Sequence, residues 1–242
     1  MTSQIPVPRP LSESAPRPLE VLHVTDLSPS YRRVRFLAYH LLGAHLDPAP
    51  TVELAFPDGR LRPFTVVEFD AKAGELSIDF LLHGNGGSAN TWASAASAGQ
   101  TIGVRGPSGE AARLPAGISK VVLAGDASAL PTLTALAAHL EPHQVADIVV
   151  QVPSTADVHT FDSPAALNVE WLVATAAEPR PLPRALRKLP VDKVDHWWVA
   201  CEATSARIVR EHLAMERAVP EAHSQVTAYW SASTEEPAEG LL

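Results

Sequence analysis

The chain has 242 residues, of which 46% are hydrophobic and 19% are charged, and its formal net charge is -8. This composition is typical of a globular protein with one large or two small domains, and it excludes a disordered chain. The negative charge argues against non-specific binding to nucleic acid or to anionic membranes, because such binding needs clustered Lys and Arg. No run of about 18 apolar residues is present, so we expect no membrane span.

The N-terminus is rich in Pro and Ser and has no apolar stretch typical of a signal peptide, so residues 1–18 are predicted to form a flexible arm. Cys201 is the single cysteine, and it therefore fits a reducing compartment in which no internal disulfide forms. We expect a cytoplasmic protein that acts as a monomer and has no nucleic-acid partner.

Residues 19–112 show the pattern of successive antiparallel strands. Short segments with alternating hydrophobicity are separated by turn residues such as Pro57-Asp58-Gly59. About six strands of this kind are enough to close a small barrel. The predicted strands are Glu20–Thr25, Arg33–Ala38, Thr51–Phe56, Arg62–Phe69, Glu75–Leu82 and Thr101–Arg105.

Residues 119–233 follow a different pattern, in which buried-type strands alternate with helical segments. Such alternation predicts a parallel sheet with crossover helices. The predicted fold is an N-terminal six-stranded antiparallel β-barrel followed by a small parallel α/β nucleotide-binding domain, with a loose acidic tail at residues 234–242. The expected strands are Lys120–Leu123, Val145–Val152, Val169–Ala174, His196–Ala200 and Gln225–Trp230, and the expected helices are Leu130–Leu140 and Thr204–Ala218.

The strand that begins at Arg62 carries the first candidate site. On an extended strand Arg62 and Phe64 share one face, while Thr65 points to the other. An arginine can pair with a phosphate, an aromatic ring can stack on a flavin, and a threonine hydroxyl can hydrogen-bond a ring nitrogen. The alternative is an ordinary barrel strand with an exposed arginine.

A second candidate follows at His83–Ala93, where a glycine-rich turn leads into a short helix predicted at Asn90–Ala98. Glycines allow close approach of the backbone, and a helix start presents free N–H groups to an anion. The run Gly84-x-Gly86-x-x-Ala89 matches the dinucleotide fingerprint. Because the preceding strands look antiparallel and the helix is short, we interpret it as a phosphate-binding turn, with a glycine-rich surface loop as the alternative.

A third candidate lies in the strand-to-helix turn from Gly125 to Pro131. Its amides could hold a second nucleotide, or Asp126 or Ser128 could simply cap the helix. Cys201 also follows an apolar strand, where a reactive thiol is one reading and a buried, inert cysteine is the other. The sequence offers no ligand set for a metal and no nucleophile motif for a hydrolase.

Together these segments resemble the siderophore-interacting protein family, the flavin-dependent ferric-siderophore reductases related to ferredoxin-NADP reductases. Arg62–Thr65 resembles the family's R-x-Y-T motif, and Asp79–Ala93 resembles its D-F-V-L-H-G…G-P-A-S-x-W-A segment. The resemblance covers roughly residues 19–232. The other segments that follow the family's order are Gly106–Gly109, Gly125–Pro131, Trp198–Ala203 and Tyr229–Trp230.

The resemblance implies FAD bound at the barrel, with NADPH or NADH as electron donor over the second domain and a ferric siderophore as substrate. The flavin carries the chemistry, so no catalytic side chain is assigned and no resident metal is expected. The residues implied at the FAD site are Arg62, Phe64, Thr65, Asp79, His83, Gly84, Gly87, Ser88, Ala89, Asn90, Thr91 and Trp92. Those implied on the NAD(P)H side are Gly125, Asp126, Ser128, Ala129, Cys201, Glu202 and Trp230.

Several positions depart from the family's pattern. Phe64 replaces its tyrosine, Ala127 an acidic residue, Cys201 a glycine and Ser231 a basic residue. These changes leave the nicotinamide donor and the particular siderophore open. Two alternatives remain: an FAD-containing oxidoreductase with another donor or acceptor, and a non-catalytic carrier that binds FAD or a siderophore.

Overall fold

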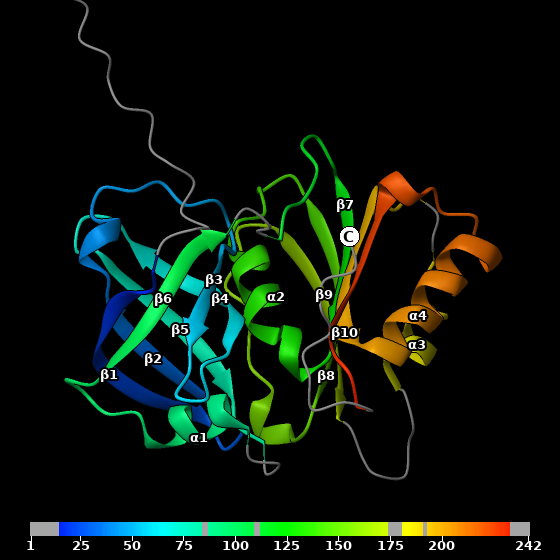
Figure 1. Ribbon diagram of the computed structural model, residues 1–242. Helices are drawn as coiled ribbons and strands as arrows, with labels where there is room; N and C mark the ends of the chain where they lie inside the picture. The colour runs from blue at the N-terminus through cyan, green and yellow to red at the C-terminus, as the bar shows by residue number, and fades with distance from the viewer. Residues whose placement is uncertain (1–14, 84–86, 109–111, 174–180, 191–192, 233–242) are drawn as a thin grey trace, which may run out of the picture.

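The structure is a computed structural model, and it describes residues 15–83, 87–108, 112–173, 181–190 and 193–232. In this part of the chain a closed antiparallel barrel is followed by a five-stranded parallel sheet flanked by helices (Figure 1). The predicted fold class is confirmed. Among the described residues, no helix has both the length and the apolar character that crossing a membrane requires.

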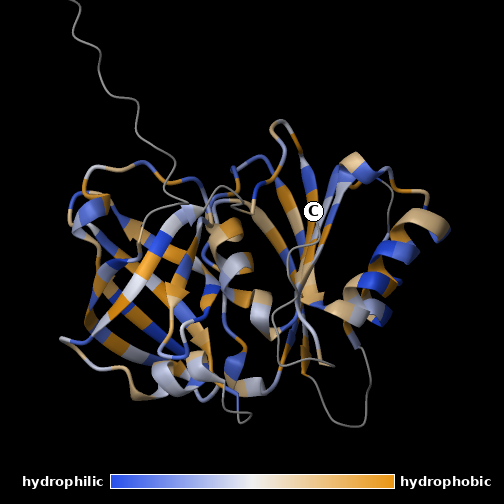
Figure 2. Cartoon of the chain, in the orientation of Figure 1, coloured by the Kyte–Doolittle hydropathy of each residue, from blue (hydrophilic) through white to orange (hydrophobic). Residues whose placement is uncertain are grey.

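The barrel closes in the order β1-β2-β5-β4-β3-β6, with the last strand pairing back onto the first. Hydrophobic and hydrophilic residues alternate along its strands (Figure 2), because successive side chains point into and out of the barrel. Val34, Phe36, Leu54 and Ile78 are fully buried in its interior. The strands are β1 Arg17–Ser28, β2 Tyr31–Leu37, β3 Thr51–Ala55, β4 Leu61–Asp70, β5 Glu75–Leu81 and β6 Thr101–Ser108.

The second sheet has the order β11-β10-β7-β8-β9, and every neighbouring pair is parallel. Its central strands are apolar on both faces, as expected for a sheet covered on both sides by helices. Its strands are β7 Lys120–Gly125, β8 Val145–Val152, β9 Ala166–Val173, β10 His196–Glu202 and β11 Ser224–Trp230. The helices are α2 Leu130–Ala138, α3 Pro181–Leu186 and α4 Ala203–Glu211, while α1 Ser88–Ala95 belongs to the barrel.

Helix α2 lies between the barrel and the parallel sheet, and α3 and α4 lie beyond the sheet's other face (Figure 1). An apolar cluster lies on each face of the parallel sheet. Leu123 and Ile148 pack with α2, whereas Val122 and Val199 pack with α3 and α4. The barrel is also tied to the turn after β7, since the Tyr31 hydroxyl donates to a backbone carbonyl there, that of Ala127, at 2.7 Å.

Some boundaries differ from those predicted. Strand β1 begins at Arg17, within the segment expected to be an arm, because Arg17 pairs with Val104 of β6. The helix predicted at Asn90–Ala98 is observed at Ser88–Ala95. The predicted arm up to residue 14, Gly84 to Gly86 and the tail from residue 233 lie outside the described residues.

Two differences concern helices in the second half. The helix predicted at Thr204–Ala218 ends as α4 at Glu211 and continues as a π-helical turn at His212–Glu216. Helix α3 was not predicted, because its sequence contains two prolines, and prolines usually indicate a turn. Its prolines lie in the first turn, where a missing N–H has no helical partner to lose.

Candidate functional site

One end of the barrel brings β4 and α1 together across a tight turn. The turn Pro57-Asp58-Gly59 joins β3 to β4, and the amide of Phe56 donates to the carbonyl of Arg60 at 3.0 Å. Gly59 has a φ of +78°, a left-handed conformation that glycine adopts at little cost. The register then sets Arg62 opposite Leu54. The turn and the strand register thus place the Arg62 guanidinium at the end of the barrel that carries α1.

Three polar side chains meet there, and we name Asp58, Arg62 and Ser88 the barrel-end cluster. Arg62 donates through both terminal nitrogens to one oxygen of Asp58, at 3.1 and 3.2 Å, and also to the Ser88 hydroxyl at 2.8 Å. That hydroxyl in turn donates to the same Asp58 oxygen at 2.7 Å. Hydrogen bonds from Ser88 and from the Arg60 amide, together with the Arg62 charge, lower the pKa of Asp58 to about 2.

The start of α1 adds to the cluster. Gly87 is the N-cap residue and has no side chain with which to cap the helix, whose first N–H groups point beyond its end. A Cβ built on Gly87 would meet nothing within 4 Å, so the space beside this backbone is open. The guanidinium and the hydroxyl of the first residue of α1 therefore meet at one carboxylate oxygen, and the start of α1 lies beside them. The donor set fits a diphosphate such as that of FAD.

Aromatic rings close the barrel beneath this position. Phe64 is half-buried, and its ring centroid lies 4.8 Å from that of Phe80 and 5.8 Å from that of Phe56. Trp92 of α1 stacks on Phe36 at 6.1 Å. These contacts give Phe64 and Trp92 a packing role within the barrel, so a stacking role of Phe64 on a flavin stays a prediction.

Thr65 faces the other way, as predicted for the residue after Phe64. Its hydroxyl oxygen lies 2.7 Å from that of Thr132 in α2, which lies 3.3 Å from the hydroxyl oxygen of Tyr229 in β11. This row of hydroxyls crosses from the barrel to the parallel sheet, and it is separate from the barrel-end cluster. Thr132 was not predicted as a site residue. Its position one residue after the Gly125–Pro131 segment was the available signal.

Other predicted FAD-site residues have partners of their own. Asp79 accepts from Arg33 at 2.6 and 2.9 Å, because the two residues lie opposite each other in the β2–β5 register. The Asn90 side chain accepts from the amide of His83 at 2.9 Å and so ties the start of α1 to the end of β5. Ala89 packs against the barrel core, and Thr91 is exposed.

The turn after β7 forms a second cluster around a buried carboxylate. Asp126 is 7% exposed. It accepts hydrogen bonds from the Ser128 amide and hydroxyl at 2.9 and 2.6 Å, from the Glu202 amide at 2.7 Å and from the Trp230 indole at 2.9 Å. Four predicted residues from three segments are thus brought together. Asp126 does act as a cap, but of the 3-10 turn Ala127–Ala129, whereas helix α2 begins after Ala129 without a side-chain cap.

Glu202 has a similar role at the next strand end. Its carboxylate accepts from the amides of Thr204 and Ser205 at 2.8 and 3.0 Å and caps α4. Burial alone would raise its pKa, but the hydrogen bonds from these amides hold the pKa of Glu202 below its ordinary value.

Gly125 and Cys201 are explained by packing. A Cβ on Gly125 would lie 2.5 Å from the Cβ of Ala129 and 2.7 Å from the carbonyl oxygen of Ala200, so only glycine fits there. Cys201 is 1% exposed and packs into the apolar cluster shared with α3 and α4, on the sheet face opposite α2. Burial raises the pKa of its thiol, which is the behaviour of an inert cysteine.

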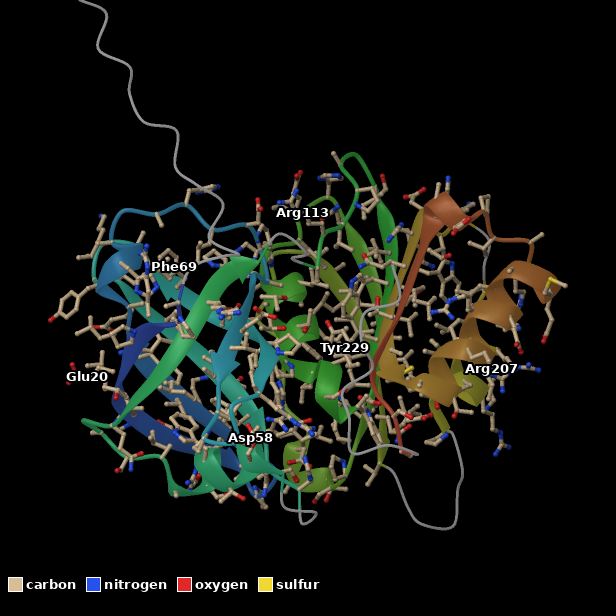
Figure 3. All side chains as sticks on the ribbon, in the orientation of Figure 1. Glu20, Asp58, Phe69, Arg113, Arg207 and Tyr229 are labelled. Atoms are coloured by element: carbon tan, nitrogen blue, oxygen red, sulfur yellow. The ribbon has the colours of Figure 1, made fainter. Side chains whose placement is uncertain are left out.

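Sequence reasoning missed Asp58, although it is the central acceptor of the barrel-end cluster. The sequence feature that could have identified it is an aspartate in a Pro-Asp-Gly turn, four residues before Arg62. Figure 3 shows Asp58 at the end of the barrel where α1 lies, and Tyr229 on the parallel sheet near α2. The two clusters therefore belong to different parts of the molecule, with the row of hydroxyls between the barrel and the sheet.

Comparison with known families gives two matches. The family model described as siderophore-interacting FAD-binding domain matches residues 55–111, which contain the barrel-end cluster. The model described as siderophore-interacting protein matches residues 118–233, which contain the parallel sheet.

Individual proteins give the same picture. The ferric vibriobactin reductase ViuB of Vibrio cholerae is 29% identical over 182 residues, which span 73% of this chain but just under two thirds (66%) of ViuB. The crystal structure of the siderophore-interacting protein SipS from Aeromonas hydrophila has a TM-score of 0.80 at 26% identity, covering 91% of this chain and 93% of SipS. A siderophore utilization protein from T. fusca has a TM-score of 0.79 at 29% identity, with 90% and 93% coverage.

Proposed function

Because the chain belongs to the siderophore-interacting protein family, we propose that it is an FAD-dependent reductase that passes electrons from NADPH or NADH to a ferric siderophore and so releases Fe(II). The observation that carries this proposal is that the Arg62 guanidinium and the hydroxyl of Ser88, the first residue of α1, meet at one carboxylate oxygen. The similarity to ViuB supports the ferric siderophore as substrate class.

In this proposal the side chains bind and orient, and the cofactor does the redox chemistry. Bound FAD would supply a group that accepts a hydride and returns electrons one at a time. Arg62 would neutralise the diphosphate, and the N–H groups at the start of α1 would hold its oxygens. Thr65 would offer a hydroxyl on the opposite face of β4, next to Thr132.

The donor would bind at the carboxyl ends of β7 and β10, where ligands of open α/β sheets lie. Asp126 and Glu202 are already engaged in capping hydrogen bonds, so they would support this region rather than contact the nucleotide. Trp230 is 43% exposed while its indole N–H is held by Asp126, and it therefore offers a fixed flat surface at these strand ends. We include a cytoplasmic setting in the proposal, because a reducing compartment supplies NADPH and suits the single cysteine.

The test is an absorption spectrum of the purified protein under anaerobic conditions. Flavin bands that bleach on addition of NADPH or NADH and return on addition of a ferric siderophore would support the reductase. The Fe(II) released should be captured by a colorimetric ferrous chelator in the same cuvette. Flavin bands that stay unchanged with both NADPH and NADH would favour another donor or a carrier. A protein that binds no FAD would contradict the proposal.

A further inference from the structure

Arg62 has a partner of its own in this structure. Both terminal nitrogens donate to a single oxygen of Asp58, and one of them also donates to Ser88. A guanidinium also binds a phosphate through its terminal nitrogens, so the donors that a diphosphate needs are those that Asp58 now engages. The Ser88 hydroxyl, at the first residue of α1, is engaged by the same oxygen.

One oxygen of Asp58 thus accepts from both the guanidinium and the hydroxyl of Ser88, the first residue of α1. A phosphate oxygen would use the same two side-chain donors, and here a carboxylate of the chain engages them. A diphosphate that arrived there would have to displace the carboxylate or lie beside it. Either event costs free energy, because the first breaks charge-assisted hydrogen bonds and the second places like charges a few ångströms apart.

We propose that Asp58 is an internal competitor for the diphosphate of FAD, and that it lowers the affinity of the barrel for the cofactor. The inference rests on the proposed function, since it assumes that FAD is the ligand of the barrel-end cluster. It assigns a role to a residue of the β3–β4 turn, which the site prediction did not include.

The setting of Asp58 allows displacement. Its side chain is 33% exposed, compared with 19% for Arg62, and it lies in a turn ahead of β4 rather than within a strand. Its remaining oxygen accepts from the Arg60 amide at 3.0 Å and holds the turn. The carboxylate can therefore leave Arg62 without disturbing the strand pairs that start at Leu61.

The competition does not depend on pH near neutrality. The pKa of Asp58 is lowered to about 2, so the carboxylate is charged between pH 5 and pH 8. An uncharged residue of the same shape is therefore the appropriate probe. Asn keeps the oxygen that accepts from the Arg60 amide and removes the negative charge.

The experiment compares FAD and riboflavin binding to the wild-type apoprotein and to Asp58→Asn, by quenching of flavin fluorescence. Riboflavin lacks the diphosphate and reports on the ring alone. The matched control is Asp47→Asn, which breaks the ion pair between Asp47 and Arg113. Arg113 lies at the end of the barrel opposite Asp58 (Figure 3), so this variant removes the same charge away from the proposed site.

Removal of the competing charge should lower the Kd for FAD by about tenfold in Asp58→Asn and leave the Kd for riboflavin within about twofold. Asp47→Asn should match the wild type for both ligands. The variant should also gain more thermal stability from FAD than the wild type does, even if its apoprotein melts lower.

Equal FAD binding by Asp58→Asn would overturn the inference, and so would weaker binding, which would mean that Asp58 orients Arg62 for the cofactor. Tighter binding of both FAD and riboflavin would also overturn it, because the effect would not come from the diphosphate. Failure of both proteins to bind FAD would instead overturn the proposed function, and the inference with it.

Discussion

Two aspartates of this chain each accept several hydrogen bonds, yet their surroundings differ. Asp126 is 7% exposed and is held by two backbone amides, a hydroxyl and an indole from three segments of the α/β part. Asp58 is exposed, with 33% of its side-chain surface accessible, and its two side-chain partners, Arg62 and Ser88, are groups that a diphosphate could also bind. The number of hydrogen bonds does not tell the two residues apart.

The two aspartates differ in the hydrogen-bond donors that would lose their acceptor if the carboxylate moved. If Asp126 moved, two partly buried amides, a hydroxyl and an indole N–H would lose their shared acceptor, which costs several kcal/mol. If Asp58 moved, Arg62 and Ser88 would face solvent or a ligand. The buried carboxylate of Asp126, with all its hydrogen bonds inside the protein, therefore supports the fold. The exposed carboxylate of Asp58, hydrogen-bonded to an arginine, can instead be replaced by another anion.

The largest expected effect follows from this contrast. Asp126→Ala should lower the free energy of unfolding by about 3 kcal/mol, because four donors from three segments lose their shared acceptor. Urea denaturation followed by tryptophan fluorescence measures this, since Trp230 is one of the partners. Asp58→Ala, the matched variant, should shift the midpoint far less. Equal losses in the two variants would contradict the distinction between them.

The next largest effect concerns FAD binding at the barrel-end cluster. Arg62→Ala should weaken FAD binding by about 100-fold, because a charged donor pair to the diphosphate is lost. Isothermal titration of the apoprotein with FAD measures the change. Arg113→Ala is the control, since that arginine pairs with Asp47 at the opposite end of the barrel. Unchanged FAD affinity in Arg62→Ala would remove Arg62 from the site.

His196 extends the comparison to a buried polar ring without a partner. It is 5% exposed, and within the described part of the chain neither ring nitrogen makes a hydrogen bond. Burial, with a smaller contribution from the charge of His223, lowers its pKa. A lowered histidine pKa means that the unfolded chain binds the proton first, so stability is complete above about pH 6.5 and falls as the pH drops below it.

We therefore expect His196→Leu to flatten the fall in stability between pH 7 and pH 5 and to be about 1 kcal/mol more stable than the wild type at pH 5. Thermal melts at each pH measure this. His143, whose side chain is 57% exposed, provides the control variant His143→Gln. An unchanged slope in His196→Leu would show that this ring does not set the acid sensitivity.

The smallest expected effect is an absence of pH dependence at the barrel end. Because the pKa of Asp58 is depressed to about 2, its contact with Arg62 is fully formed above the ordinary aspartate value of 3.8 and is lost only as the pH falls toward 2. The ratio of the FAD dissociation constants of wild type and Asp58→Asn should therefore stay constant from pH 5 to pH 8. A ratio that changes across this range would point to a different titrating group.

The strands were predictable because their patterns are local. Alternation identified all six barrel strands, and β8 was predicted at the observed bounds, Val145–Val152. Strand and helix ends were less accurate. The start of β1 at Arg17 depends on its pairing with β6, far away in the sequence, and α3 tolerates its two prolines because both lie in its first turn.

The site was predictable only in part, for a related reason. Arg62 and the glycine-rich start of α1 are visible as residue types, and the structure brings Arg62 and Ser88 into contact. What each polar group binds in the folded chain is not visible in the sequence. The partners of Asp79 and Asp126 come from strands or turns that only the folded register sets beside them.

For Cys201, too, the sequence did not show where the side chain lies in the folded protein. Its position at a strand end allowed a role near the nicotinamide, but the side chain enters the core on the face away from α2. Which of the two faces a strand residue takes depends on the sheet register, and a departure of one residue reverses the answer.

A crystal structure of the FAD complex would show whether the diphosphate binds beside Arg62, Ser88 and the start of α1. We expect the guanidinium of Arg62 to contact the diphosphate and the Asp58 carboxylate to have turned away from the guanidinium. An intact pair between Asp58 and Arg62, with the diphosphate bound elsewhere, would show that the barrel-end cluster is not the FAD site.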